Sequence, residues 1–247
     1  AVLVLCGVSG LEVQAEIVWD VMEEKQLPKV IFINKLDREN ANAQKVVDQL
    51  RAAYPNARFV PVQIPIGQEA DFVGVVDIVK NKAYYYETNG SGKFTENEVP
   101  DSLKGEVESL REALADAAAE ADDEIMMKYL EGEPLDENEL NTILKKALEQ
   151  NMIVPILYGS AFKNIGIHNL IEFLAPNCPP PKPIPEKAAL VFKTLTDPYV
   201  GKMSFFRVYG GEIAADSVIY NSTREVEEKL GQPFYLRGKN QEPANKV

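Results

Sequence analysis

Residues 29–37, Lys-Val-Ile-Phe-Ile-Asn-Lys-Leu-Asp, decide how this chain folds. Positions 30–33 form a short apolar run in which three of the four residues are β-branched. Such a run is typical of a strand buried on both faces of a parallel sheet. It stops at Asn34, Lys35 and Asp37, which puts three polar side chains at the carboxyl end of the strand. Open α/β sheets bind their ligands at that edge.

The pattern Asn-Lys-x-Asp at this edge suits the hydrogen-bonding groups of guanine. The Asp37 carboxylate only accepts, so it can take both the N1–H and the N2 amino group of guanine, a contact that adenine cannot match. Lys35 can lay its methylene stem along the base, and Asn34 can tie neighbouring loops together. A site built around such an acceptor rejects an analogue that lacks the donor by roughly 10⁴–10⁵. The alternative interpretation is a strand followed by an Asx-type turn.

A second apolar run at residues 153–158 is followed by Gly-Ser-Ala-Phe-Lys-Asn at 159–164. If both runs are strands of one parallel sheet, this turn lies at the same edge as Asp37. The backbone N–H groups of Ser160 and Ala161 can then approach the O6 atom of guanine. Taken alone, the Ser-Ala-Phe tripeptide is equally well explained as a turn.

Strands and helices alternate around these two runs, which predicts a doubly wound parallel sheet. The expected strands are 1–6, 30–33, 59–64 and 153–158, and the expected helices are 11–27, 41–54 and 166–175. Trp19 is expected to anchor the first helix on the sheet. Within 65–153 the rhythm breaks: we expect antiparallel strands at 72–79 and 82–87, one long amphipathic helix over 103–130, and a helix through 149 that Asp136 caps.

The last part of the chain has a different character. Residues 176–187 hold six prolines and predict a stiff extended linker that is neither helix nor central strand. Beyond it, short strands at 189–195, 204–209 and 217–220 predict a small antiparallel β domain of sandwich or barrel type.

The formal net charge of −12 is concentrated in one segment, because residues 65–153 carry 21 acidic and 8 basic side chains. This segment should face solvent or a basic partner and not nucleic acid phosphate. No apolar run approaches the length of a membrane span, and no signal peptide is evident. Cys6 and Cys178 lie far apart and form no metal or redox motif, which fits a cytoplasmic protein.

Several other motifs lack the context that their chemistry needs. Gly-Ser-Gly-Lys at 90–93 does not fit a phosphate-binding loop, since Glu stands at 87, Phe at 94, and a hairpin is expected there. Asp-Phe-Val-Gly at 71–74 is interpreted as chance, and His168, the only histidine, as a packing residue. We therefore expect no catalytic residue and no Mg²⁺ site, and we expect that the chain does not hydrolyse nucleotide. Its affinity for guanine nucleotide should be roughly millimolar or weaker.

The chain resembles elongation factor G along essentially its whole length. The stretches that carry the resemblance are 34–38, 72–77, 128–130, 159–164, 197–201 and 205–209, while 220–223 and 237–242 resemble its elongation-factor-G-like paralogues in particular. The resemblance implies the C-terminal half of a GTP-binding domain of P-loop-NTPase type at 1–64 and 154–176, an acidic α+β insertion at 65–153, a linker at 177–187 and the start of a β-barrel domain at 188–247.

It also implies a function, the movement of tRNA and mRNA on the ribosome coupled to GTP hydrolysis. Asn34, Lys35 and Asp37 would hold the guanine of GTP or GDP, with the backbone of Ser160 and Ala161 at O6. The implied partners are ribosomal RNA, which Arg237 and Lys239 could meet, and the stalk protein of the large subunit; neither a membrane nor DNA is implied. The family's phosphate loop and switch segments precede the position of Ala1, so we expect a fragment with only the guanine half of the site.

Two alternatives stay open, and with them the question of whether this chain acts as an enzyme. One is a translational GTPase of the ribosomal-protection or release type, against which Phe-Phe-Arg-Val-Tyr at 205–209 argues. The other is a non-catalytic ribosome- or stalk-interacting module with a vestigial base site. A dinucleotide oxidoreductase is disfavoured because the chain has no Gly-x-Gly-x-x-Gly turn.

Overall fold

The computed structural model of the protein describes residues 1–178, 184–197 and 201–247, with the side chain of residue 118 left aside. The chain divides into two compact units, Ala1–Pro179 and Pro180–Val247. Each is described by itself below. No helix within the described ranges is long and apolar enough to cross a membrane.

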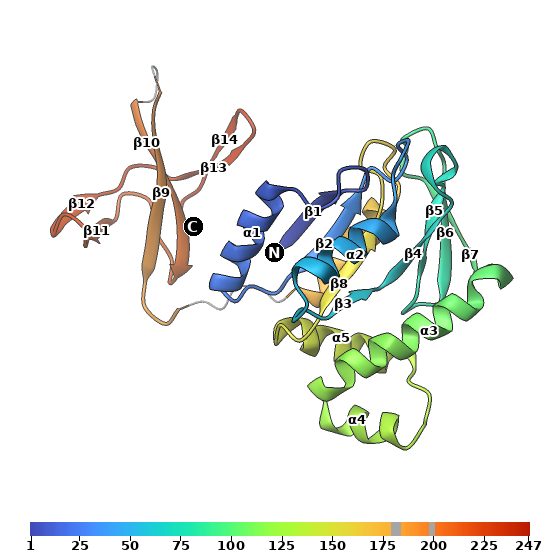
Figure 1. Ribbon diagram of the computed structural model, residues 1–247. Coiled ribbons are helices and arrows are strands. Elements are labelled where there is room, and N and C mark those ends of the chain that lie inside the picture. The colour runs from blue at the N-terminus through green and yellow to red at the C-terminus, as the bar shows by residue number, and fades with distance from the viewer. Residues whose placement is uncertain (179–183, 198–200) are drawn as a thin grey trace. The chain divides into compact units, whose positions relative to one another are not determined.

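Unit 1 is built on a four-stranded parallel sheet with the strand order β1-β2-β8-β3 (Figure 1). Its strands are β1 (Val2–Cys6), β2 (Val30–Asn34), β8 (Val154–Tyr158) and β3 (Phe59–Pro61). The register aligns Cys6 with Asn34 and Ile33 with Tyr158, so the carboxyl ends of β1, β2 and β8 lie at one edge. The predicted parallel sheet, and the mixed α/β fold class, are confirmed.

Helices cover both faces of this sheet because side chains alternate along each central strand. One face packs on α1 (Val13–Glu24) and α2 (Ala43–Ala53), which lie on the same side of the sheet in Figure 1. The opposite face packs on α5 (Glu137–Glu149) and α6 (Ile167–Asn177). The first core contains Ile31, Ile33, Ile156, Val46 and Leu50, and the second contains Phe32, Leu157, Ile143, Leu144 and Leu148.

Trp19 anchors α1, as predicted. Its side chain is buried, and its ring stacks on that of Tyr54 with 4.3 Å between centroids. The apolar residues Val13, Ile17 and Val21 of the same helix are exposed. Since β1 is the edge of the sheet, α1 covers it with only one side of its surface.

The chain passes directly from the parallel sheet into a second, antiparallel sheet with the order β4-β5-β6-β7. The single strand expected over 59–64 is therefore two strands, β3 and β4 (Gln63–Ile66), which pair with different partners. The remaining strands are β5 (Gly74–Asp77), β6 (Lys82–Tyr86) and β7 (Phe94–Glu98), with a 3₁₀ turn at Glu69–Asp71. Their buried side chains join both cores of the parallel sheet: Ile64, Val76 and Ala83 join the one beneath α5, and Val75, Tyr84 and Tyr86 join the one beneath α1 and α2.

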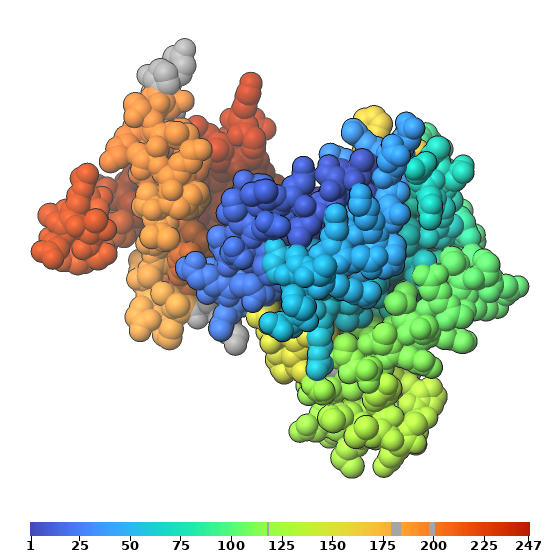
Figure 2. Space-filling model, in the orientation of Figure 1, coloured from blue at the N-terminus to red at the C-terminus, as the bar shows by residue number. Residues whose placement is uncertain are grey.

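The long helix expected over 103–130 is wrong as one element. The structure has α3 (Asp101–Ala118), a 3₁₀ turn at Ala119–Ala121, and α4 (Asp123–Leu130). Asp122 breaks the helix because its side chain accepts hydrogen bonds from the backbone N–H groups of Glu124 and Ile125, which starts a new helix there. In Figure 2, α3 and α4 (green) lie below the blue and cyan surface of the parallel-sheet part of unit 1.

One prediction near the linker also needs correction. Pro176 was expected to lie outside any helix, but it stands in the last turn of α6. This is feasible because the helix ends within two residues of it, at Asn177. Part of the predicted 177–187 linker, residues 179–183, lies outside the described residues, as do residues 198–200.

Unit 2 consists of antiparallel ladders, and no helix occurs among its described residues. The ladders are two-stranded: β9 (Ala188–Asp197) with β10 (Gly201–Gly210), β11 (Val218–Asn221) with β12 (Val226–Lys229), and β13 (Phe234–Arg237) with β14 (Asn240–Pro243). The antiparallel character of this unit is confirmed, and its identity as the start of a barrel domain stays a prediction.

Candidate nucleotide-base site

The two loops that the sequence singles out meet at the carboxyl edge of the parallel sheet. The Ala161 N–H donates to Asn34 Oδ1 at 2.9 Å, although the two residues are 127 positions apart. The Leu36 N–H donates to the Gly159 carbonyl at 3.3 Å, and the Gly159 N–H to that of Ile33 at 3.0 Å. Asn34 thus joins the two loops, the role that its position predicts.

A third loop, at residues 7–10, packs against the same place. The Gly7 N–H donates to the Asn34 carbonyl at 2.7 Å, and the Gly7 carbonyl accepts from the Asn42 N–H at 2.9 Å. A methyl group on Gly7 would lie 2.8 Å from Leu36 Cδ2 and 3.1 Å from the Asn34 carbonyl oxygen, so a larger residue there would crowd both neighbours. Leu36 is buried in this corner. The backbone that carries Asn34 to Asp37 is therefore held by both neighbouring loops.

Lys35 and Asp37 are more exposed than Leu36, which lies between them in the sequence. Lys35 is exposed and has a left-handed backbone with φ of 64°, and its N–H donates to Asn34 Oδ1 at 2.8 Å. Asp37 is half-buried, and no hydrogen bond or ion pair engages its carboxylate within the described part of the chain. Its oxygens can therefore accept from a ligand without losing an existing partner.

Ser160 and Ala161 are placed as predicted beside Asn34, but their N–H groups already have acceptors. Ser160 is buried, and its N–H donates to the Ile165 carbonyl at 2.9 Å. The Ala161 N–H is the donor to Asn34 described above. A contact from Ala161 to guanine O6 therefore requires this hydrogen bond to be exchanged for the one to the base.

Residues 159–164, which we call the base loop, form a tight cradle at the strand end. A methyl group on Gly159 would lie 2.6 Å from Phe32 Cζ and 2.5 Å from the Ile165 carbonyl oxygen, so only glycine fits there. Lys163 N–H donates to Ser160 Oγ at 3.2 Å, which closes the turn. An available carboxylate, an exposed lysine stem and a small-residue loop fit the donor edge and the flat face of guanine.

The other motifs are placed as their context predicts. Gly90 to Lys93 lie in the hairpin between β6 and β7, which the Glu87 N–H closes by donating to the Lys93 carbonyl at 2.9 Å. The His168 ring lies 4.7 Å from that of Phe94, a packing role. Among the described residues, no group of three or more His, Cys, Asp or Glu could hold a metal ion.

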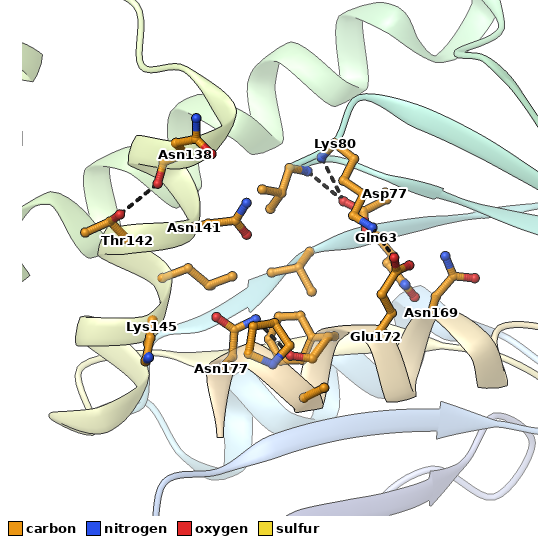
Figure 3. A pocket seen from close by; sticks show the side chains of 16 residues that line it. Gln63, Asp77, Lys80, Asn138, Asn141, Thr142, Lys145, Asn169, Glu172 and Asn177 are labelled. Atoms are coloured by element: carbon orange, nitrogen blue, oxygen red, sulfur yellow. Dashed lines mark hydrogen bonds and ion pairs between the residues drawn. The ribbon is translucent and has the colours of Figure 1, made fainter. Parts of the chain in front are cut away.

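A cavity of about 620 Å³ lies elsewhere in unit 1, between α5, α6 and the strands β4 and β5 (Figure 3). None of the predicted site residues lines it. Lys80 and Glu172 form an ion pair of 2.6 Å at its edge, and Asp77 Oδ1 accepts from two backbone N–H groups. Burial raises the pKa of the Asp77 carboxyl. Asn169 is buried, and its Nδ2 has no partner within the described ranges.

In this doubly wound parallel sheet, Asn-Lys-x-Asp follows β2, and a small-residue loop follows β8, which is the neighbour of β2 in the sheet. This arrangement suits the binding of a guanine base at the carboxyl edge. Residues 1–180 match the sequence profile of the family described as the elongation factor Tu GTP binding domain. The chain belongs to this family of GTP-binding domains, and it is therefore a domain of translational GTPase type.

The chain is also similar to a solved structure, the crystal structure of a protein from Thermus thermophilus. The two are 26% identical, with a TM-score of 0.83 over 98% of this chain. The present chain spans only 36% of the length of that protein. The similarity supports the whole fold of the chain, including its antiparallel strands.

Proposed function

We propose that this chain carries the guanine-recognition half of the nucleotide site of a translational GTPase of elongation factor G type. The observation that carries the proposal is the hydrogen bond from Ala161 N–H to Asn34 Oδ1, which joins the two predicted loops at one edge of the sheet. On this proposal Asp37 accepts from N1 and N2 of guanine, Lys35 covers one face of the base, and the Ser160 and Ala161 backbone faces O6.

The assignment to the elongation factor G type draws on motifs of the sequence. The solved structure from Thermus thermophilus matches the insertion and the unit 2 strands as well as the GTP-binding part, which supports their common fold. The sequence motifs at 72–77, 205–209 and 237–242 resemble that factor and its paralogues. Since the chain spans 36% of the matched protein, GTP-driven movement of tRNA and mRNA is proposed for a longer factor of which these residues are one part.

We propose that the 247 residues alone do not hydrolyse GTP. Hydrolysis needs groups that orient a water and hold Mg²⁺ against the phosphates. The Gly-Ser-Gly-Lys stretch at 90–93, which comes closest to a phosphate loop, lies in a β-hairpin and not between a strand and a helix. Phosphate release from GTP, measured with and without ribosomes, should stay at the buffer rate, and a ribosome-stimulated rate would contradict this part of the proposal.

The proposed cytoplasmic partner is the ribosome. The exposed surface of α4 combines acidic residues with two exposed apolar side chains, Met127 and Leu130, which suits a protein partner such as the stalk of the large subunit. Arg237 and Lys239 in unit 2 are the proposed contacts to ribosomal RNA. Arg237 has an exposed side chain that lies 3.3 Å from Glu242, so a contact with RNA phosphate would compete with that carboxylate.

The substitution Asp37→Asn tests the assignment of the base site. The amide presents an NH₂ donor where the carboxylate accepts, so the variant should lose affinity for GDP and gain affinity for xanthosine diphosphate, whose C2 carbonyl is an acceptor. Both affinities can be measured by NMR titration of the isotopically labelled chain. An unchanged ratio of the two dissociation constants would remove Asp37 from the site.

A second candidate function is a ribosome-binding module in which the base site is vestigial. One observation favours it: the N–H groups of Ser160 and Ala161 are both satisfied within the protein, so the loop is closed without a ligand. This candidate predicts that Asp37→Ala leaves any weak GDP binding unchanged. A loss of GDP binding in Asp37→Ala would exclude it.

A further inference from the structure

The hairpin between β6 and β7 is held by hydrogen bonds among its own residues. Asn89 Oδ1 accepts from the Ser91 N–H at 2.9 Å, and Ser91 Oγ donates to Glu87 Oε2 at 3.1 Å. Ser91 Oγ also accepts from the Lys93 N–H at 3.2 Å. Because these hydrogen bonds fix the conformation of residues 87–93, the hairpin can also fix the position of residues that pack against it.

What it contacts is the base loop. A methyl group on Gly92 would lie 2.3 Å from Nδ2 and 2.9 Å from Cγ of Asn164, so the hairpin backbone lies directly against that side chain. A methyl group on Gly90 would lie 3.9 Å from the Phe162 carbonyl oxygen. The Asn164 N–H in turn donates to the Ala161 carbonyl at 3.4 Å.

The insertion also contacts α6, which begins at Ile167, shortly after the base loop. Tyr86 donates from its hydroxyl to Asn169 Oδ1 at 2.6 Å inside the protein, and the Phe94 ring packs on that of His168. Lys80 pairs with Glu172 one turn further along (Figure 3). Burial raises the pKa of Tyr86 to about 12, so its hydroxyl remains a donor at neutral pH. The base loop is thus held from the insertion at Asn164 and through the helix that follows it.

We propose that the β6–β7 hairpin, residues 87–93, is a positioning element for the base loop: it fixes Asn164, and through it Ala161, so that affinity for guanine nucleotide depends on the insertion. This inference rests on the proposed function of the base site. Gly92 is the residue that sets the contact, because its φ of 71° favours glycine and a side chain there would displace the amide of Asn164.

The test compares two glycines with the same backbone requirement. Gly92→Val should force Asn164 aside, whereas Gly132, with φ of 82°, has nothing within 4 Å of a methyl group, so Gly132→Val carries the backbone strain without the contact. We expect Gly92→Val to weaken GDP binding about threefold to thirtyfold, the range of substitutions that act through neighbours. It should also shift the amide resonance of Ala161, while Gly132→Val changes neither. Trp19 fluorescence reports whether each variant is folded.

Tyr86→Phe provides a second route, since it keeps the ring and removes only the hydrogen bond to Asn169; a smaller loss of GDP affinity in the same direction is expected. Equal GDP affinities and equal Ala161 amide shifts for Gly92→Val and Gly132→Val would overturn the inference. If the unsubstituted chain binds no GDP, the proposed function fails. The Ala161 amide shift in Gly92→Val then still decides whether the hairpin positions the loop.

Discussion

The strand β8 of unit 1 and the strand β9 of unit 2 differ in how deeply their side chains are buried. β8 is buried at all five positions, because it pairs on both edges and helices cover both of its faces. β9 pairs only with β10 among the described residues, and most of its side chains are exposed. Buried apolar area is the main source of folding free energy, whereas isolated two-stranded ladders are marginal. Unit 1 should therefore be much the more stable of the two.

The largest effect should come from truncating the unit 1 core. Leu144 on α5 is fully buried, and Leu144→Ala should cost about 2–5 kcal/mol of unfolding free energy in a urea titration followed by Trp19 fluorescence. The matched change in unit 2 is Phe192→Ala on β9, whose side chain is 65% exposed. It should alter the amide exchange of β9 and β10 by less than about 0.5 kcal/mol. Equal costs in the two units would contradict the contrast in burial.

A smaller effect on stability is expected from the N-terminal cap of α5 in unit 1. Asp136 caps α5 in a reciprocal arrangement: its side chain accepts from the Glu139 N–H at 2.9 Å, and Glu139 Oε2 accepts from the Asp136 N–H at 2.8 Å. Asp136→Ala should cost about 1 kcal/mol in the same urea titration. Asp136→Asn keeps a good cap and should cost much less. A negligible cost for the alanine variant would show that packing alone sets the start of α5.

The smallest effect concerns Asp77, a carboxyl group in unit 1 whose pKa is raised by burial. A raised folded-state pKa means that the charged form is disfavoured in the folded protein, so wild type loses stability as pH rises through that pKa. Asp77→Asn keeps the acceptor for Val79 and Lys80 N–H and removes the charge.

The Asp77→Asn variant should therefore be more stable than wild type at pH 7, and the difference should vanish near or below the unfolded-state pKa of about 3.9. Urea titrations at pH 7 and at acid pH measure this. A variant that is less stable than wild type at pH 7 would mean that attraction to Lys80 outweighs the burial of the charge.

Prediction from sequence succeeded for elements whose apolar residues form a clear pattern along the chain. The apolar runs at 30–33 and 153–158 predict buried strands, and their alignment brings Asn34 and Ala161 together. The break at Asp122 was missed because the apolar spacing continues across it while the side chain caps a new helix. β7 was missed because Phe-Thr-Glu-Asn-Glu is a polar edge strand with almost no buried positions.

At the base site the sequence could identify residue types but not the state of their hydrogen bonds. That Ala161 N–H is already bonded to Asn34 follows only from how two loops 127 residues apart meet. The contact between Gly92 and Asn164 is likewise tertiary. In the sequence, Gly92 was noticed only as part of a possible phosphate-binding motif. In the structure, a side chain at this position would collide with Asn164 of the base loop.

The central claim is that residues 34–37 and the base loop together form one guanine-reading site. The most direct measurement is an NMR titration of the ¹⁵N-labelled chain with GDP, and with ADP as the matched control. The account predicts that GDP shifts the amide resonances of both Leu36 and Ala161 with a single dissociation constant, and that ADP shifts neither. GDP-induced shifts confined to one loop, or equal shifts with ADP, would contradict it.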